Sequence, residues 1–296
     1  MNLAPIVLFV YNRLWHTQQT VEALQKNELA NQSELFIYSD APKNENAVNS
    51  VAEVREYIKS IDGFKKITIV ERDKNWGLAN SIIDGVTNIV NKYGKVVVLE
   101  DDLVTSPYFL RYMNDNLEIY KDEKSVASIH GYIYPIENLP NSFFIKGADC
   151  WGWATWKDRW SLFESDGQKL LDELLSRNLQ READFNNSYG FTKMLKNQIA
   201  GKNNSWAVRW YMSSFLKDML TLYPGKSYVQ NIGNDSSGTH CSTSDMYTIN
   251  LNNSYIEEKI EIKEDSEARE KMELFFLSIK KNLFQKIVNK IRTLLS

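Results

Sequence analysis

The feature that most constrains the fold is a regular alternation in the first half of the chain. Short apolar runs rich in β-branched and aromatic residues stand at 5–11, 34–38, 66–70 and 95–99, with segments of helical length between them. Such runs are typical of buried strands. Because parallel strands need crossover connections, the alternation predicts βαβ units in a mostly parallel, doubly wound sheet. We therefore expect ligands to bind at the carboxyl ends of the strands.

The clearest predicted helix precedes the fourth apolar run. Over 78–90, apolar residues recur at three- and four-residue steps, at Leu78, Ile82, Val86, Ile89 and Val90. This spacing puts them on one face of a helix.

Composition divides the chain into three parts. The alternation occupies 1–130, and the sequence over 131–255 is rich in aromatic and turn residues with no Gly/Pro/Ser linker before it. We expect 131–255 to be the second functional half of the same domain. From 256 an acidic stretch passes into a basic amphipathic pattern that starts at about Lys271, which predicts a helical extension over 256–296.

Charge and cysteine content exclude several classes of protein. The 296 residues include 35 Lys and Arg and 38 Asp and Glu, so no global basic field exists to hold a nucleic acid. The cysteines are Cys150 and Cys241, and no signal-peptide pattern opens the chain. No stretch approaches the roughly 20 apolar residues that span a bilayer. We expect a cytoplasmic protein with, at most, peripheral membrane contact.

An acidic triplet follows the fourth apolar run. The run from Lys95 to Leu99 leads directly into Glu100, Asp101 and Asp102. Three adjacent carboxylates repel one another unless a cation is near, and oxygen ligands suit Mg²⁺ or Mn²⁺ held together with substrate phosphates. The alternative is a solvated acidic turn before a helix beginning at Ser106-Pro107. We favour the metal site because α/β enzymes place such clusters after central strands.

Four strand-end motifs together resemble the GT-A type nucleotide-sugar glycosyltransferases. They are Phe9-Val-Tyr-Asn-Arg13, Tyr38-Ser-Asp40, Glu71-Arg-Asp-Lys-Asn75-Trp-Gly77 and Glu100-Asp-Asp102. The acidic triplet with the later Gly152-Trp153 is most similar to bacterial polysaccharide glycosyltransferases and the inverting N-acetylglucosaminyltransferase I group. The resemblance implies an α/β GT-A fold, a Rossmann-like doubly wound mixed sheet with an aromatic-rich acceptor side.

The resemblance also assigns roles on the donor side. It implies that Asp102 contacts the metal bridging the donor diphosphate, with Glu100 and Asp101 against the nucleoside. Arginine presents planar donors to phosphate, and a carboxylate can accept from a base or a ribose hydroxyl. The helix after Gly77 could turn its N-terminal amides toward the ligand. The remaining residues placed near the nucleotide are Tyr11, Asn12, Arg13, Asp40, Arg72, Asn75 and Gly77.

The second half should supply the acceptor site. In the resembled group the Gly-Trp element lines the pocket near the transferred sugar, which puts Trp151, Gly152 and Trp153 in the site with Asp149 beside them. Aromatic faces suit the C–H-rich faces of sugars. For Trp156 and Trp160 we favour a place in the core. Trp206 opens a second aromatic segment that we also assign to substrate binding.

The general base cannot be transferred from the resembled group. That group carries a catalytic aspartate between tryptophans, whereas Ala207 and Val208 stand there in this chain. Arg209 could stabilise the leaving diphosphate or be a buried structural residue. We take Asp235, on a loop rich in turn residues, as the first candidate base and Asp149 as the second. His240 on the same loop resembles the histidine that many GT-A enzymes use near the metal.

These features predict a metal-dependent transfer of a sugar from a nucleotide diphosphate donor to a saccharide hydroxyl. The resemblance favours UDP, inversion of configuration, Mn²⁺ or Mg²⁺, and a role in bacterial cell-surface polysaccharide synthesis. The alternatives are a sugar nucleotidyltransferase, for which we see no Gly-rich phosphate loop near the first strand, and a non-catalytic carbohydrate-binding protein. The latter would not explain three carboxylates after a buried strand.

The C-terminal pattern predicts a helix that can lie on an anionic membrane surface. That would bring the site to a lipid-linked acceptor at the inner face of the cell membrane. The alternative is a helix packed on its own domain or in a dimer. The predicted apolar arc and its flanking cations are Leu283, Phe284, Ile287, Val288, Ile291, Leu294 and Leu295, with Lys281, Lys286, Lys290 and Arg292.

Overall fold

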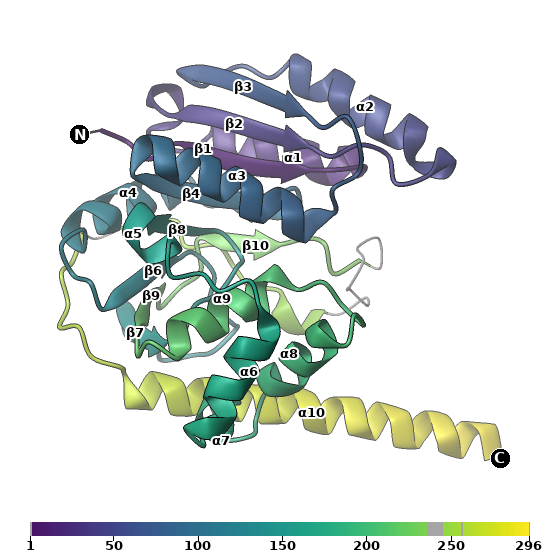
Figure 1. The fold of residues 1–296 in the computed structure, drawn as a ribbon, viewed down its shortest axis with the longest axis vertical. Coiled ribbons are helices and arrows are strands. Elements are labelled where there is room, and N and C mark those ends of the chain that lie inside the picture. Colours follow the sequence, from purple (N-terminus) through teal and green to yellow (C-terminus); the bar gives the residue numbers. More distant parts are fainter. Residues whose placement is uncertain (1, 236–244, 256, 296) are drawn as a thin grey trace.

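The structure is a computed structural model that describes residues 2–235, 245–255 and 257–295, with backbone only for Asp245 and 282–295. Within these residues, eight strands form one mixed sheet in the order β3-β2-β1-β4-β8-β6-β9-β7, and β5 pairs with β10 (Figure 1). The strands are β1 Ile6–Val10, β2 Glu34–Ser39, β3 Lys66–Glu71, β4 Lys95–Glu100, β5 Leu103–Thr105, β6 Val126–His130, β7 Ser142–Lys146, β8 Trp153–Trp156, β9 Leu220–Pro224 and β10 Val229–Asn231.

Helices cover both faces of this sheet. They are α1 Leu14–Gln25, α2 Val48–Lys59, α3 Leu78–Tyr93, α4 Phe109–Ile119, α5 Lys157–Trp160, α6 Gly167–Ser176, α7 Gln180–Ala183, α8 Phe191–Ile199, α9 Trp206–Phe215 and α10 Ser266–Leu295. The four predicted strands are confirmed as β1 to β4, which are parallel to one another. The predicted helix is confirmed as α3, which ends at Gly94 in the left-handed conformation that glycine favours.

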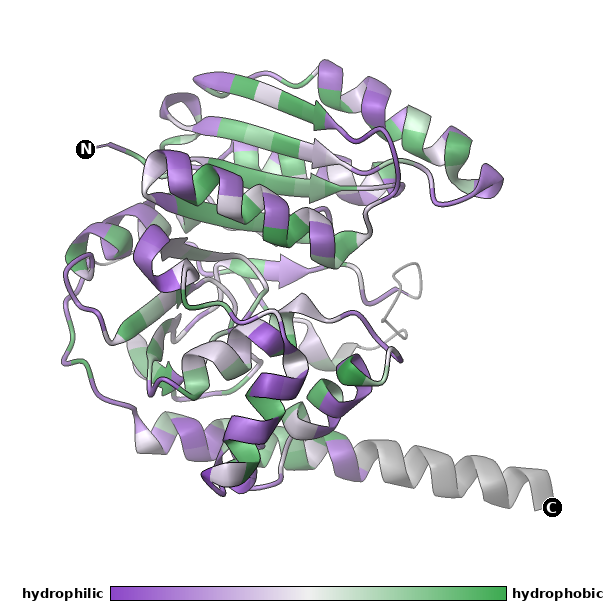
Figure 2. Cartoon of the chain, viewed as in Figure 1, coloured by the Kyte–Doolittle hydropathy of each residue, from purple (hydrophilic) through white to green (hydrophobic). Residues whose placement is uncertain are grey.

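Each face of the parallel half packs on a different set of helices. In β1, Ile6 and Leu8 pack into a core with α1, α2 and α4, whereas Val7 and Phe9 pack into a second core with α3. Side chains alternate between the two faces of a strand, so a strand that is covered on both faces must be apolar throughout. Figure 2 shows these strands as largely hydrophobic.

The second half of the chain extends the same sheet. Strand β8 inserts antiparallel between β4 and β6, with Val98 opposite Trp153. Because β8 lies inside the sheet and both of its faces are covered, all four of its residues are buried. Trp156 and Trp160 are buried as expected.

The helix predicted to start at Ser106-Pro107 begins later. Residues 103–105 form β5, which pairs antiparallel with β10, and Ser106 donates its backbone N–H to the Tyr228 carbonyl at 2.8 Å. These bonds hold Ser106 in an extended connection, so α4 starts only at Phe109. The β5–β10 pairing also brings the segment after β10 to the carboxyl end of β4.

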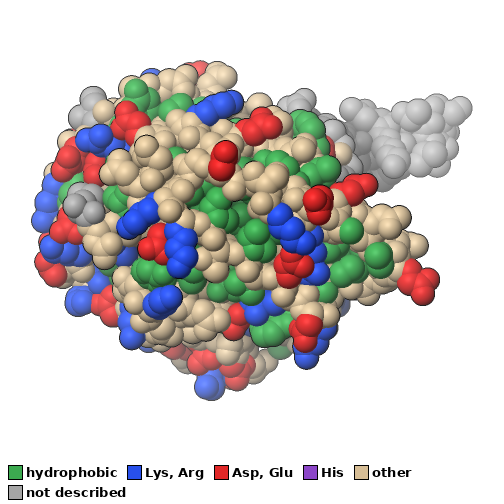
Figure 3. Space-filling model, turned by 90° about the horizontal axis from the view of Figure 1, so that it is seen from above, with side chains coloured by type: hydrophobic (Ala, Val, Ile, Leu, Met, Phe, Trp, Pro, Cys, Tyr) green, Lys and Arg blue, Asp and Glu red, His purple; other side chains and the backbone are tan. Residues whose placement is uncertain are grey.

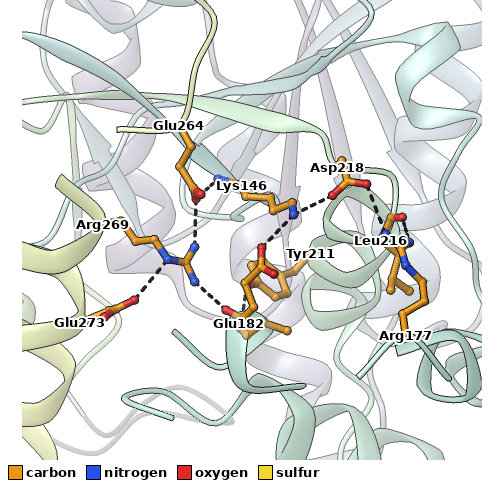
Figure 4. Close-up of polar contacts among 10 residues, drawn as sticks. Lys146, Arg177, Glu182, Tyr211, Leu216, Asp218, Glu264, Arg269 and Glu273 are labelled. Carbon is orange, nitrogen blue, oxygen red and sulfur yellow. Dashed lines mark hydrogen bonds and ion pairs between the residues drawn. The ribbon is translucent and has the colours of Figure 1, made fainter. Parts of the chain in front are cut away.

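Helix α10 begins at Ser266, earlier than the predicted start at Lys271, and its first half is part of the domain. Ala268, Met272 and Phe276 are buried in a third core with α6, α8 and α9. Arg269 contacts Glu264, Glu273 and the Glu182 carbonyl, and Lys146 joins Glu182 to Asp218 (Figure 4).

The later turns of α10 extend beyond the rest of the domain, on the side to which β1, β2 and β10 point (Figure 1). Among the described residues, no helix is long and apolar enough to cross a membrane. Seen from above in Figure 3, positive and negative side chains are interspersed over the surface, in keeping with a net charge of -3.

Candidate active site

A guanidinium group joins the two aspartates that follow β4. Arg13 lies between β1 and α1, and β1 is the neighbour of β4. Its Nη2 donates to Asp101 Oδ1 and lies 2.8 Å from Asp102 Oδ2. Burial raises the pKa of Asp101, although Arg13 opposes this shift, and burial followed by repulsion from Asp102 and Asp101 raises the pKa of Glu100. The strand end is therefore a buried acidic site balanced by one arginine.

This arrangement fits a divalent cation. One oxygen from each of the two aspartates converges on a single nitrogen, so both carboxylates can face one cation. Across the described part of the chain, no three Asp, Glu, His or Cys side chains surround a common point. The protein would then supply only part of the coordination sphere, as is usual for Mg²⁺ bound together with substrate phosphates.

The segment after β10 covers this acidic site. Ile232 donates its backbone N–H to the Asp102 carbonyl at 2.9 Å. A Cβ at Gly233 would lie 2.1 Å from Asp102 Oδ2, so only glycine allows so close an approach. Asp235 Oδ2 lies 3.0 Å from His16 Nε2 on α1. The structure thus brings Asp235 to the donor side, whereas His240 lies outside the described residues.

His16 and Gly233 were not predicted from the sequence. His16 lies in the first turn of α1, three residues after the N-cap residue Arg13, and this short spacing was the signal that the sequence offered. Nothing local marks Gly233, because its role depends on the pairing of β10 with β5.

Asp40 makes structural contacts that the sequence did not predict. Its carboxylate accepts from the backbone N–H groups of Trp76 at 2.9 Å and Gly77 at 2.8 Å. Asn75 donates to the Ala41 carbonyl at 2.7 Å. The backbone N–H groups of Trp76 and Gly77, just before α3, therefore face Asp40, and contact of Asp40 and Gly77 with a nucleotide stays a prediction. Together these contacts fix the turn that leads into α3.

The other donor-side residues lie around this turn. The Arg72 guanidinium forms an ion pair with Asp84 and lies 4.0 Å from the centroid of the Trp76 ring. Tyr11 Oη accepts from the Lys43 N–H at 3.0 Å, and Asn12 is half-buried beside it. A groove of about 600 Å³ adjoins the turn and is lined by Lys74, Asn75, Trp76, Asn80, Ile83, Asp84 and Thr87.

Asp149 contacts a backbone N–H and a tyrosine hydroxyl, with a buried histidine nearby. Its Oδ1 accepts from the Cys150 N–H at 2.8 Å, and its Oδ2 lies 3.4 Å from Tyr223 Oη and 3.6 Å from His130 Nε2. Burial lowers the pKa of His130, which favours the neutral ring. Burial, with further contributions from Asp149, Glu100 and Asp102, raises the pKa of the Cys150 thiol.

An aromatic cluster stands beside Asp149. The Trp151 ring is half-buried, with centroids 4.7 Å from Tyr132 and 5.8 Å from Tyr247. Gly152 has φ of 69° and accepts at its carbonyl from the Gly131 N–H at 2.7 Å. The tyrosines and His130 were not predicted, and the position of His130 at the carboxyl end of β6 was the signal for it.

Two tryptophans and one arginine assigned to the site belong to the core. Trp153 and Trp206 are 0% and 4% exposed, with their rings stacked 5.5 Å apart, so neither indole can face a sugar. Arg209 is also buried, and it donates to the carbonyls of Ser205 and Ser165 at 3.2 and 3.1 Å. These contacts tie α9 to the segment before α6, which corrects the assignment of Arg209 to the leaving diphosphate.

Comparison with solved structures gives similar folds at low identity. The chain is similar to TarS 1–349 of S. aureus at 10% identity and a TM-score of 0.41, covering 76% of this chain and 59% of that one. It is similar to the mannosyltransferase PcManGT of Pyrobaculum calidifontis, in complex with GDP-Man and Mn²⁺, at 13% identity and a TM-score of 0.30, covering 45% and 38%. A UDP-glucose pyrophosphorylase complexed with UDP-glucose matches at 14% identity and a TM-score of 0.39, covering 77% and 93%.

No curated protein sequence matches the chain. A family model does match, over residues 6–173, which include β1 to β4, the acidic triplet and Trp151 to Trp153. This match covers more than half of the chain and contains the strand ends that form the site. The chain belongs to glycosyl transferase family 2.

Proposed function

We propose that this protein transfers a glycosyl group from a nucleotide diphosphate sugar to a saccharide hydroxyl. The observation that carries the proposal is the convergence of Asp101 and Asp102 on one cationic nitrogen at the switch point of the sheet, between β1 and β4. Membership of the family supports the reaction class. A UDP-sugar is the favoured donor and bacterial cell-surface polysaccharide synthesis the favoured setting.

Asp102 and Asp101 would hold Mn²⁺ or Mg²⁺ in this reaction. The bound ion would supply Lewis-acid stabilisation of the charge that develops on the leaving diphosphate. Gly233 lets the backbone pass close to the Asp102 carboxylate. Arg13 offers planar donors next to the same carboxylates.

Asp149 is the better supported base, which reverses the order of our two candidates. Its carboxylate is 25% exposed and lies beside Trp151 and the tyrosines, where a sugar could stack. The Tyr223 hydroxyl can hold its orientation without adding a fixed charge. Asp235, in contrast, is paired with His16 on the donor side. A single base that removes the acceptor proton agrees with inversion.

Product analysis tests the reaction class. The full chain would be incubated with UDP-, GDP- or dTDP-sugars, Mn²⁺ and a panel of saccharide acceptors. We expect acceptor-dependent release of nucleoside diphosphate, greatest with a UDP-sugar. In a parallel incubation with a sugar phosphate and a nucleoside triphosphate, release of pyrophosphate would instead indicate a nucleotidyltransferase. Binding of a sugar without any turnover would indicate a binding protein.

The C-terminal helix supports a lipid-linked acceptor. The sequence over 274–296 contains five Lys and Arg and no Asp or Glu. On α10, Leu274 and Leu277 are 59% and 49% exposed, so the domain does not cover this face. Exposed leucines followed by a sequence with cations and no acidic residue suit an anionic bilayer surface. Because α10 leaves the domain on the side of the strand carboxyl ends, such binding would bring the site toward the bilayer (Figure 1).

A further inference from the structure

We propose that Arg13 is a built-in counter-cation that makes metal and donor diphosphate bind cooperatively. In the free enzyme it neutralises Asp101 and Asp102, and it transfers its contacts to the diphosphate when metal and donor bind together. This inference rests on the proposed function, since it concerns the same metal site. It adds a coupling role for one named residue.

The contacts of Arg13 support a side chain that can change partners on a fixed backbone. The Arg13 carbonyl accepts from the Thr17 N–H at 3.0 Å and from Thr17 Oγ1 at 2.9 Å, which anchors the residue to α1. Its Nη2 serves both carboxylates. Its buried Nη1 has no hydrogen-bond partner among the described residues, although five donors are available on the guanidinium. The group therefore has unused capacity for a second anion.

Burial makes a counter-cation necessary. The side chains of Asp101 and Asp102 are 7% and 13% exposed, and an unpaired buried charge is strongly destabilising. The Arg13 guanidinium offsets the repulsion between the Asp101 and Asp102 carboxylates as long as it stays in contact with both. A divalent cation that ligates the same two oxygens would meet the guanidinium at the same point, and two cations repel each other there. Metal alone should consequently bind weakly.

A diphosphate removes this conflict. It offers negative oxygens to both cations, and a guanidinium binds phosphate with parallel hydrogen bonds. Arg13 can then leave the carboxylates to the metal without losing an anionic partner. Because binding free energies are reciprocal, metal must raise donor affinity by the same factor by which donor raises metal affinity. Arg13 is thus a positioning residue whose charge sets that factor.

The test measures Mn²⁺ and UDP binding to the purified full chain, separately and together, by calorimetry and by the electron spin resonance signal of free Mn²⁺. In Arg13→Gln we expect Mn²⁺ alone to bind about tenfold more tightly than in the wild type, within the range usual for coupled sites. UDP alone should bind more weakly. The ratio of Mn²⁺ affinities with and without UDP should fall about tenfold, because the coupling that remains comes only from direct contact of the metal with the diphosphate.

Two further variants complete the design. Arg13→Lys keeps the charge and loses the planar fork, so Mn²⁺ alone should bind as weakly as in the wild type while UDP binds less tightly. This variant carries the test if Arg13→Gln does not fold. Arg111→Gln is the matched control, because Arg111 is an exposed arginine on α4 that pairs with Glu28 and Asp115. It should change neither affinity.

The outcome separates this inference from the proposed function. If Mn²⁺ binds in the presence of UDP but Arg13→Gln leaves the affinity for Mn²⁺ alone and the ratio unchanged, the role of Arg13 is refuted and the metal site stands. If UDP affinity is also unchanged in Arg13→Lys, the transfer of contacts to the diphosphate is wrong. If wild type binds no Mn²⁺ even with UDP, the proposed metal dependence itself fails.

Discussion

On the donor side of the site, carboxylates face guanidinium groups, whereas on the acceptor side Asp149 faces neutral donors. Arg13 contacts Asp101 and Asp102, and Arg72 pairs with Asp84. Asp149 has a backbone N–H, a tyrosine hydroxyl and a histidine whose pKa is lowered by burial. Fixed charges suit a ligand that carries charge, and neutral donors leave a carboxylate free to accept a proton. Under the proposed function, this difference would distinguish a side that binds phosphate from a side that supplies the general base.

The largest effect should come from removing charge on the donor side. Asp102→Asn keeps the side-chain size but removes one negative charge from the metal site. We expect transfer to fall at least about 1,000-fold, because Lewis-acid stabilisation contributes several kcal/mol at the transition state. Initial rates against Mn²⁺ concentration would measure this. Asp122→Asn, on an exposed turn, is the matched control, and wild-type rates with unchanged metal dependence in Asp102→Asn would refute the assignment.

A substitution on the acceptor side should lower kcat without changing UDP affinity. Asp149→Asn can still accept from the Cys150 N–H, so the fold should persist while the base is lost. We expect kcat to fall about 100-fold, within the range for general base catalysis, with UDP affinity unchanged. Asp235→Asn should leave kcat near the wild-type value. The assignment is reversed if Asp235→Asn shows the larger loss at saturating substrate.

Adding a methyl group at Gly233 tests the close packing of the backbone against Asp102. Gly233→Ala would push a Cβ into Asp102, and overpacking of this kind should lower the free energy of unfolding by about 2 kcal/mol and weaken UDP binding. Gly201→Ala is the contrasting variant. Gly201 has φ of 68° and open space around it, so alanine there should cost about 1 kcal/mol and leave UDP binding intact. Urea unfolding and calorimetry would measure both quantities, and equal losses of UDP affinity would contradict the packing argument.

The smallest effect on catalysis should come from the C-terminal helix. Truncation after Lys281 keeps Ala268, Met272, Phe276 and Ile279 in the core, so the protein should fold and act on a soluble acceptor at the wild-type rate. It should no longer co-sediment with vesicles that contain phosphatidylglycerol. Vesicles of phosphatidylcholine alone are the control. Failure of the full chain to bind either vesicle would exclude the membrane role.

The sequence predicts the parallel half of the fold well, because strands buried on both faces must be apolar and the motifs follow them directly. It fails for Trp153, since residue type does not reveal that β8 inserts inside the sheet and is covered on both sides, and for Trp206, whose ring α9 packs against Trp153. It does not predict that backbone N–H groups of a later turn contact the Asp40 carboxylate, because the two segments are far apart in the sequence. His16 and Asp235 are far apart in sequence, and only the pairing of β5 with β10 brings them together.

That pairing also has a consequence for how the protein is made. Val229 to Asn231 must meet Leu103 to Thr105 before Gly233 can close over Asp102, so the site depends on contacts of high sequence separation. Such contacts form late, because closing a long loop costs entropy before the contact offsets it. On a ribosome, the parallel half could fold while its acidic end is still uncovered. The chain would then bind the donor only when nearly the whole domain has been synthesised. Donor binding could therefore serve as a measure of complete folding.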